Sequence, residues 1–390
     1  GMIGVLNDNL VLALLEYLAP KDLGLIGSVS KAFLAFSFHD DLWRYLVLGS
    51  LKGDFVWQRS WRQTWITSAS RKDTHISRQT SHIAHISPIE EVGIDCNLCS
   101  DTLYHSWRCK TADIDSSWIS KDNITRVECK NLSIETFVEE IESKHQPVMM
   151  SGAMDGWSCT EKWTNRYLAQ NYGSLKFSVG GYQMALENYL NYMSSEPLDD
   201  QSLYLFDPNF VKTCPSMGSD YQVPPFFSKE RDLFGVLESS RPNYRWLIMG
   251  PKRSGSTFHK DPNGTSAWNA CVRGVKKWIL LPPSVTPPGV HSRHQQPHSK
   301  TNLNHSSPFD HHQTRIESVD TRQSIETIGT NQTRHKANQT IHLSHFHLFS
   351  CVRIDRKYLV LCCAWSKSHI LSHIWSHILC FCLSALMGWM

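Results

Sequence analysis

A His-x-Asp pair between two strand-like runs constrains the fold of this chain more than any other feature. The runs cover residues 245–249 and 277–281, and His259 and Asp261 lie between them, separated by one residue. In an extended backbone, residues i and i+2 project to the same face, so we expect this imidazole and carboxylate to lie side by side. Such donors suit Fe(II), which two His and one carboxylate hold while other positions stay open for a cosubstrate and O₂. Alone, the pair is weak evidence, because isolated His-x-Asp motifs are more often surface loops.

Two polar residues further along the chain strengthen the prediction of a site. Asn269 and Lys276 follow His259 at ten and seventeen residues, and Lys276 opens the run K-K-W-I-L-L, which is typical of a barrel strand. A lysine inside a pocket is costly unless it meets an anion. We therefore expect Lys276 to pair with the carboxylate of a bound small molecule.

The segment around these residues resembles a known enzyme family. H-K-D-P-N-G-T-S-A-W-N-A, followed by G-V-K-K-W, resembles the Jumonji C oxygenases, in particular the arginine-demethylase and lysyl-hydroxylase branch. The resemblance extends over residues 122–290 and includes S-L-Y-L-F-D, V-P-P-F-F, D-L-F and R-P-N-Y-R-W. It implies an enzyme that uses Fe(II) and 2-oxoglutarate. By motif position it also implies His259 and Asp261 as iron ligands, Lys276 as partner of the distal carboxylate of 2-oxoglutarate, and Tyr204, Ser256 and Asn269 as contacts of this cosubstrate.

The third metal ligand is the point at which the chain departs from that family. The resemblance implies a second His far downstream, in a strand entered through Gly and Trp, and no such context follows Val290. The nearest candidates are His345 and His347, which we interpret as histidines of the tail rather than ligands. Iron held by two protein groups would bind weakly, so the sequence leaves open whether this chain is catalytically active.

The pattern of predicted elements is that of an α+β fold. The family resemblance and the helices that precede the barrel strands imply a cupin-like jelly roll, or double-stranded β-helix, with a helical flank. Since we expect no strands after Val290, we expect this barrel to be incomplete. The predicted elements are a helix over 134–144 capped by Ser133, a strand over 147–150, a helix over 160–173, a strand over 177–179 and a helix over 184–193.

The first fifty residues predict a small N-terminal bundle of three short helices. Apolar residues recur at helical spacing, Pro20 interrupts them, and D-D-L-W opens the third helix. By spacing alone, packing of these leucines into a core is the preferred interpretation. However, the segment with L-A-P-K-D-L resembles an F-box. That resemblance implies a surface for the Skp-type adaptor of a cullin ubiquitin ligase, formed by Leu10, Leu14, Pro20, Leu23 and Val29.

Four segments follow from these patterns. Residues 6–51 form the F-box-like bundle, 52–117 a docking segment with a polar insertion, and 118–290 the truncated Jumonji C domain. Residues 291–390 hold 13 of the 20 histidines. We interpret this tail as disordered or as the product of a retained intron or wrong gene model, and a His-rich metal-binding tail is the alternative.

Charge and cysteine usage limit the class of partner. The 39 basic and 36 acidic residues give a net charge of +3, so no overall basic field favours direct binding to nucleic acid. Twelve irregularly spaced cysteines and no recognisable signal peptide favour reduced thiols in the nucleus or, alternatively, the cytosol. The apolar run 368–390 contains three histidines, so we expect no membrane span.

Two functional hypotheses follow. The enzyme hypothesis is an Fe(II)/2-oxoglutarate oxygenase of the histone-demethylase or lysyl-hydroxylase type, acting on a histone tail or another basic protein. The binding hypothesis is an F-box adaptor that recruits a substrate to a ubiquitin ligase through an incomplete, non-catalytic barrel. Turnover dependent on iron and 2-oxoglutarate distinguishes the first from the second.

Overall fold

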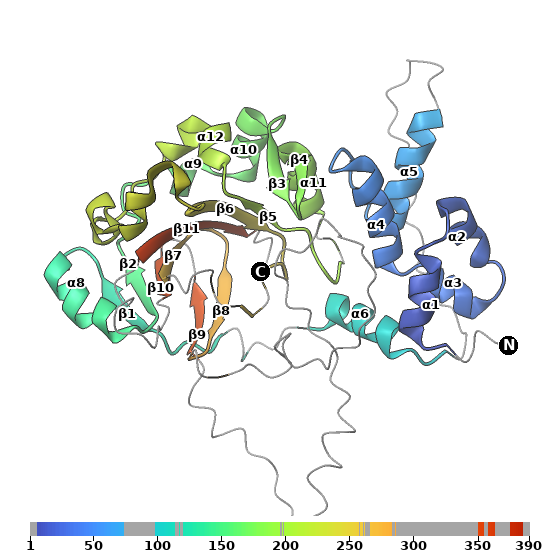
Figure 1. Cartoon of the computed structure of the whole chain (residues 1–390), viewed down its shortest axis with the longest axis horizontal. Helices are drawn as coiled ribbons and strands as arrows, with labels where there is room; N and C mark the ends of the chain where they lie inside the picture. Colours follow the sequence, from blue (N-terminus) through green and yellow to red (C-terminus); the bar gives the residue numbers. More distant parts are fainter. Residues whose placement is uncertain are drawn as a thin grey trace, which may run out of the picture.

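A mixed β-sheet with helices on one side organises the computed structural model (Figure 1). The structure describes residues 6–73, 98–113, 117, 120–195, 197, 199–256, 258–259, 261, 266–282 and 285, together with the backbone of three strands near the C-terminus. The larger sheet has nine strands in the order β1-β2-β10-β7-β11-β6-β5-β3-β4, and β8 and β9 pair separately. The strands are β1 (Thr125–Glu128), β2 (Val148–Ser151), β3 (Lys176–Val179), β4 (Tyr182–Ala185), β5 (Leu205–Asp207), β6 (Arg245–Gly250), β7 (Ser266–Arg273), β8 (Lys276–Leu280), β9 (Ser350–Ile354), β10 (Tyr358–Cys362) and β11 (Trp375–Ser384).

Short helices cover the outer face of the nine-stranded sheet (Figure 1). The side chains that pack beneath them alternate along the strands, as the two-residue period of a strand requires. Trp268 and Ala270 of β7 and Met249 of β6 belong to the main core, and Phe227 stacks on Trp268 with 5.6 Å between ring centroids. The helices of this region are α8 (Ile134–Glu140), α9 (Cys159–Lys162), α10 (Asn165–Tyr172), α11 (Leu186–Ser194), α12 (Phe210–Thr213) and α13 (Pro215–Gly218), with 3-10 turns at Glu142–Lys144, Pro225–Phe227, Lys229–Arg231 and Leu233–Ser240.

Most elements predicted between residues 130 and 281 are confirmed. β2, β3, β6 and β8 lie within a residue or two of the predicted runs, and the Ser133 hydroxyl caps α8 by accepting from the N–H of Thr136 (3.1 Å). The predicted helix over 160–173 is wrong as a single element, because the chain breaks at Trp163 and the Thr164 side chain caps a second helix. The last predicted helix begins two residues late, because Met184 belongs to β4.

The N-terminal region contains four helices between residues 6 and 51, so the predicted number of three is wrong. They are α1 (Asp8–Leu15), α2 (Pro20–Ile26), α3 (Lys31–Ser37) and α4 (Asp40–Leu51), and α5 (Trp61–Asp73) and α6 (Asp101–Thr111) follow. The extra helix arises because Ser30 caps a new start, accepting from the N–H of Phe33 (3.2 Å). Trp57 and Trp61 are buried, and Trp57 packs on Tyr192 of α11.

Three strand segments lie within the tail, which corrects the expectation of no strands after Val290. β10 pairs antiparallel with β2 and β7, β11 pairs parallel with β6 and β7, and β9 pairs antiparallel with β8. These runs contain Val, Ile, Tyr, Phe and Trp, residues that favour strands, and they pair with strands that are distant in the sequence. Because β11 runs parallel to both neighbours, the sheet is mixed rather than antiparallel throughout, as a jelly roll would be. The incompleteness of the barrel and the origin of the tail stay predictions.

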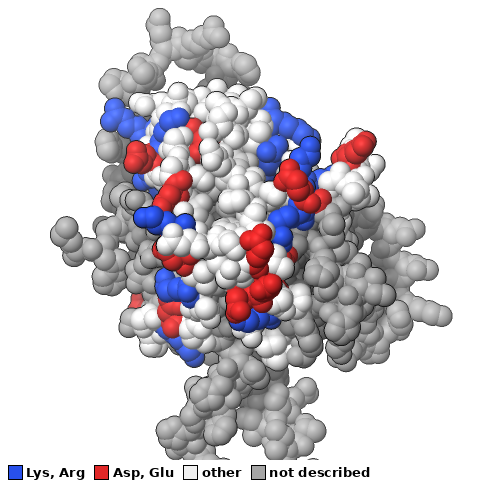
Figure 2. Space-filling view, turned by 90° about the vertical axis from the view of Figure 1, so that its left-hand side faces the viewer, with Lys and Arg blue, Asp and Glu red and all other residues white. Residues whose placement is uncertain are grey.

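Two surface properties complete the description. On the face around α8, basic and acidic side chains are interspersed (Figure 2), and pairs such as Lys144 and Glu140, 2.7 Å apart, neutralise one another. Within the described ranges, none of the helices is both long enough and apolar enough to span a lipid bilayer.

Candidate metal and cosubstrate site

A tight turn after β6 begins the loop that carries the predicted donor pair. A Cβ atom on Gly250 would lie 1.9 Å from Ser254 Oγ and 2.8 Å from Tyr204 Cδ2, so only glycine lets the turn fold back so closely. The Ser254 hydroxyl closes the turn by donating to the carbonyl oxygen of Pro251 (2.7 Å). The turn therefore places the start of this loop directly beside Tyr204.

His259 and Asp261 face each other within this loop. His259 Nε2 lies 3.3 Å from Asp261 Oδ1, and the two side chains are 47% and 29% exposed. Two donors that bind one metal ion at right angles, each at about 2.1 Å, lie roughly 3 Å apart, so this spacing fits a shared ion. The predicted side-by-side arrangement is confirmed, although the pair lies in a loop between β6 and β7 rather than in a strand.

A third protein ligand does not join the pair within the described part of the chain. Among those residues, no three His, Cys, Asp or Glu side chains are grouped so that they could hold a metal ion. His345 and His347, the candidates from the sequence, lie outside the described residues. The donor pair therefore fits part of an Fe(II) coordination sphere, in agreement with the chemistry of nitrogen and oxygen ligands.

Asn269 lies on the face of β7 opposite Trp268. Its side chain is only 2% exposed, and neither its amide nitrogen nor its amide oxygen has a hydrogen-bond partner among the described residues. A buried amide without partners is rare in folded proteins and calls for a polar group that satisfies it. A small polar ligand such as 2-oxoglutarate would supply that group, so Asn269 fits the role predicted from the sequence.

Lys276 lies next to an aromatic ring at the start of β8. Its Nζ atom is 4.1 Å from the ring centroid of Trp278, and the ammonium group is thus held by the negative face of the ring. Trp278 packs against a small buried cluster that contains Cys271 of β7, two residues from Asn269 on the same face. The ring thereby holds the lysine near the sheet face that carries the unpaired amide.

Tyr204 and Ser256 complete the predicted set. Tyr204 is half-buried before β5 and stacks on Phe206, with 6.5 Å between ring centroids. Ser256 is exposed three residues before His259. The roles of all six predicted residues stay predictions, whereas the structure brings Tyr204 to the turn and the two donors to one another.

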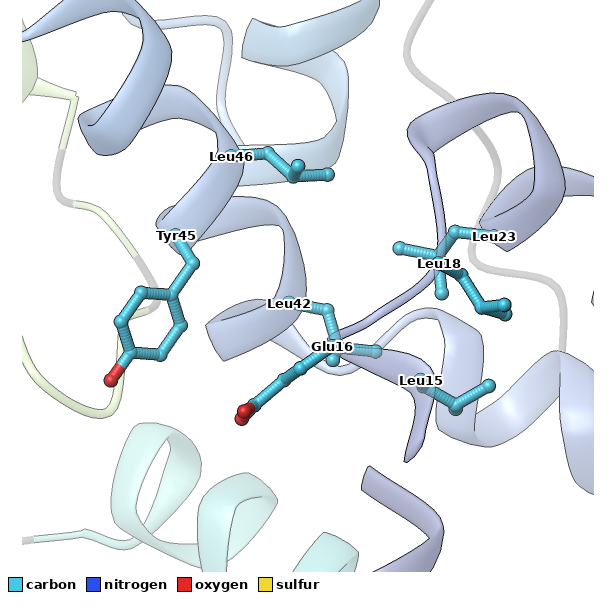
Figure 3. A pocket seen from close by; sticks show the side chains of 7 residues that line it. All are labelled: Leu15, Glu16, Leu18, Leu23, Leu42, Tyr45 and Leu46. Carbon is cyan, nitrogen blue, oxygen red and sulfur yellow. The ribbon is translucent and has the colours of Figure 1, made fainter. Parts of the chain in front are cut away.

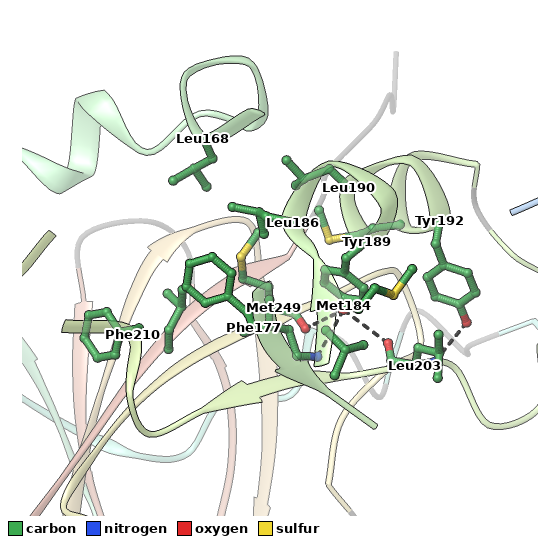
Figure 4. Close-up of a cluster of buried hydrophobic side chains, with 14 of the residues drawn as sticks. Leu168, Phe177, Met184, Leu186, Tyr189, Leu190, Tyr192, Leu203, Phe210 and Met249 are labelled. Carbon is green, nitrogen blue, oxygen red and sulfur yellow. Dashed lines mark hydrogen bonds between the residues drawn. The ribbon is translucent and has the colours of Figure 1, made fainter. Parts of the chain in front are cut away.

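The buried hydroxyl group of Tyr189 contacts backbone groups at the end of β6 and at the start of β5 (Figure 4). It donates to the carbonyl oxygen of Met249 (2.7 Å) and accepts from the N–H of Leu205 (3.2 Å). The end of β6 and the start of β5 are therefore joined through a buried side chain. No sequence pattern indicated this contact, because a tyrosine at helical spacing is typical of an ordinary core residue.

A buried carboxylate connects the N-terminal helices to the segment before Tyr204. Asp199 Oδ2 accepts from the indole N–H of Trp61 (3.0 Å) and the hydroxyl of Tyr192 (3.0 Å), and Oδ1 lies 3.4 Å from Arg44 Nη1. Burial raises the pKa of Asp199 to about 6, although Arg44 acts in the opposite direction. The sequence did not reveal this residue, because its partners come from distant parts of the chain.

The fold and the site together define a cupin-like domain with a candidate iron and 2-oxoglutarate site. The family model "Cupin-like domain" matches residues 134–345, which is more than half of the chain. The chain therefore belongs to the cupin-like domain family.

Known relatives agree with this assignment. The chain is 43% identical over 291 residues to "Arginine-specific demethylase JMJ22" of Arabidopsis thaliana, an alignment that covers 75% of this chain and 55% of the relative. It is 37% identical over 190 residues to "Bifunctional arginine demethylase and lysyl-hydroxylase psr-1" of Caenorhabditis briggsae, covering 45% and 47%. It is also 31% identical over 87 residues to "2-oxoglutarate and iron-dependent oxygenase JMJD4 homolog" of Drosophila melanogaster, covering 22% and 20%. The chain thus spans about half the length of the first two relatives or less, and the predicted resemblance is supported at the level of the oxygenase family.

Proposed function

We propose that this chain is an Fe(II)- and 2-oxoglutarate-dependent oxygenase that acts on side chains of a protein. The observation that carries the proposal is the donor pair His259 and Asp261, 3.3 Å apart, in the same domain as the unpaired buried amide of Asn269. When bound, iron and 2-oxoglutarate supply the oxidation of a C–H bond by O₂ with release of succinate and CO₂.

The residues of the site have distinct roles in this proposal. His259 Nε2 and Asp261 Oδ1 hold the metal, and the Lys276 ammonium, which the Trp278 ring already stabilises, pairs with the distal carboxylate of 2-oxoglutarate. The Asn269 amide satisfies its hydrogen bonds with the same molecule. The hydroxyl groups of Tyr204 and Ser256 contact it from the side of the turn.

The substrate class comes from the relatives. Since JMJ22 is named as an arginine-specific demethylase and psr-1 as an arginine demethylase and lysyl-hydroxylase, we infer that the substrate is an arginine or lysine side chain of a basic protein such as a histone tail. Removal of a methyl group from arginine would release formaldehyde, whereas hydroxylation of lysine would not. We propose the nucleus as the place of action, in keeping with such a substrate.

The test is an assay of the full-length chain with Fe(II), 2-oxoglutarate and peptides that carry methylated arginine or unmodified lysine. We expect succinate release that depends on iron and on peptide, with formaldehyde as the marker of demethylation. Succinate formation that is the same with and without the metal would rule the proposal out.

Replacement of Asn269 separates stability from cosubstrate binding. Asn269→Leu keeps the branched shape and the number of side-chain heavy atoms and removes two buried polar atoms without partners, so we expect the free energy of unfolding to rise by about 1 kcal/mol. We expect the same variant to lose 2-oxoglutarate binding. Thermal unfolding measures the stability, and calorimetric titration measures the binding of 2-oxoglutarate. A variant less stable than the wild type would contradict the conclusion that the Asn269 amide has no hydrogen-bond partner in the folded chain.

A second candidate function is favoured by the exposed apolar residues of the N-terminal helices. Leu10 and Leu14, one turn apart on α1, are 50% and 56% exposed, and Val29 is 67% exposed. These are three of the residues that the F-box resemblance assigns to a Skp-type adaptor. Leu23, assigned to the same surface, is instead 1% exposed, so its predicted role is wrong and it belongs to the core.

A cavity of about 220 Å³ lies next to these helices (Figure 3). Its walls are mainly leucine side chains from α1, α2, α4 and the segment between α1 and α2, with Glu16 and Tyr45 as polar groups. We propose that the exposed side chains of Leu10, Leu14 and Val29, together with this cavity, form the surface that binds the adaptor. This function would exist in addition to the enzymatic site or in place of it.

Substitution at Leu14 tests the adaptor surface. We expect Leu14→Asp to weaken binding of a purified Skp-type adaptor by at least about tenfold, because a charge would replace an apolar contact, while the melting temperature stays within a few degrees of the wild type. Leu23→Ala is the control for a change in the core, since loss of a buried leucine costs about 2–5 kcal/mol of stability, whereas Leu14 lies at the surface. Equal adaptor binding by the wild type and Leu14→Asp would exclude this surface.

A further inference from the structure

The guanidinium group of Arg253, in the turn that follows β6, lies against the C-terminal end of α6. Its Nη1 atom donates to the carbonyl oxygens of Cys109 (3.1 Å) and Lys110 (2.6 Å), and Nη2 donates to the carbonyl oxygen of Ala112. The last carbonyl groups of a helix have no partner within it and form the negative end of its dipole. The forked guanidinium group therefore supplies this helix end with hydrogen-bond donors for its carbonyl groups and with a positive charge for the negative end of its dipole.

Arg253 makes these contacts from a left-handed backbone conformation, with φ of 71°. Residues other than glycine adopt this conformation at a cost, and it persists only where surrounding contacts hold it. The hydrogen bonds to α6 are such contacts. The shape of the turn and the position of α6 are therefore coupled.

The helix that Arg253 caps is itself fixed to the N-terminal helices. Ser100, the N-cap of α6, donates to Asp8 Oδ2 of α1 (2.6 Å), and Lys110 forms an ion pair with Asp40 of α4. Both ends of α6 are thus anchored. The whole helix precedes residue 134, where the match to the cupin-like family begins.

The loop that follows Arg253 has no regular secondary structure among its described residues. Its described residues between 251 and 261 lie in neither a helix nor a strand, so no ladder of backbone hydrogen bonds fixes them. We propose that Arg253 is a positioning residue: by capping α6 it fixes the loop that carries Ser256, His259 and Asp261, and so sets the affinity of the site for its metal ion. The identity of the ligand rests on the proposed function, whereas the contact between Arg253 and α6 does not.

Three variants isolate this role. Arg253→Gly removes the whole side chain, including the guanidinium group, and relieves the cost of the left-handed conformation. Arg253→Lys keeps the charge without the fork. Arg273→Ala is the matched control, because Arg273 also donates to helix-end carbonyl groups, those of Trp163 (3.0 Å) and Glu161 (3.2 Å) at α9, rather than to α6.

The first measurement is a titration of the full-length, metal-free chain with Mn²⁺, in which electron paramagnetic resonance monitors the binding of the ion. We expect Arg253→Gly to weaken Mn²⁺ binding by about 10- to 100-fold, Arg253→Lys to lie between it and the wild type, and Arg273→Ala to bind as the wild type does. Wild-type Mn²⁺ affinity in Arg253→Gly would overturn the proposal.

The second measurement is hydrogen exchange of the metal-free chain, which does not depend on the proposed function. We expect Arg253→Gly to increase exchange in both 101–111 and 251–261, and Arg273→Ala to increase it around α9 alone. Unchanged exchange in 251–261 would overturn the positioning role. If the wild-type chain binds no Mn²⁺, the proposed function fails, and the exchange result alone then decides whether Arg253 positions the loop.

Discussion

Asp261→Ala is expected to abolish iron-dependent succinate release and to weaken Mn²⁺ binding by at least about 100-fold, because it removes one of the two donors that the described loop supplies. The carboxylate is 29% exposed and its contact is His259, so no core packing is lost. The melting temperature should therefore change little. A loss of activity without loss of stability is the signature that separates a metal ligand from a structural residue.

Two further variants support the interpretation of this result. Asp54→Ala removes an exposed carboxylate in the segment before α5 and should leave both activity and Mn²⁺ binding unchanged. Asp261→Glu keeps the charge but lengthens the side chain, so we expect partial recovery of Mn²⁺ binding with little recovery of turnover. Full activity of Asp261→Ala would mean that the metal, if any, is bound elsewhere.

The features of the site that could be predicted are those whose sequence patterns extend over only a few neighbouring residues. The spacing of His259 and Asp261 predicted their proximity, although the pair lies in a loop rather than in a strand. Apolar runs predicted β6 and β8, because the period of an extended chain acts over a few residues. Asn269 was singled out by its motif, but its burial without partners follows from the position of β7 between two neighbouring strands.

Contacts between distant residues account for what the sequence did not predict. Arg253 and Cys109 are 144 residues apart, and Asp199 and Trp61 are 138 apart, so neither pair leaves a local pattern. The extra helix α3 was missed because apolar spacing continues across Ser30, although the serine itself is a good helix cap. The tail strands were missed because their pairing partners, not their flanking turns, define them.

Asp199→Ala is expected to destabilise the chain by roughly 3–5 kcal/mol, because removing one partner of a buried ion pair leaves the other partner uncompensated. The indole N–H of Trp61 and the Tyr192 hydroxyl would lose their acceptor at the same time. Asp199→Asn keeps an oxygen acceptor and should cost less. Urea denaturation of the full-length chain measures both, and a smaller cost for alanine than for asparagine would contradict the proposed network.

The same carboxylate predicts a pH dependence with a definite sign. Burial raises the pKa of Asp199 from 3.8 to about 6, so between these values the folded chain binds more protons at this residue than the unfolded chain. The contribution of Asp199 to the free energy of unfolding is therefore fully present below about pH 4 and is lost as the pH rises through about 6, by roughly 3 kcal/mol. Asp199→Asn does not titrate, so the difference in unfolding free energy between wild type and variant should shift in favour of the variant over this range. A constant difference from pH 4.5 to 7.5 would show that the carboxylate of Asp199 has the same pKa in the folded and the unfolded chain. The burial of Asp199 among Trp61, Tyr192 and Arg44 would then not disfavour its charged form.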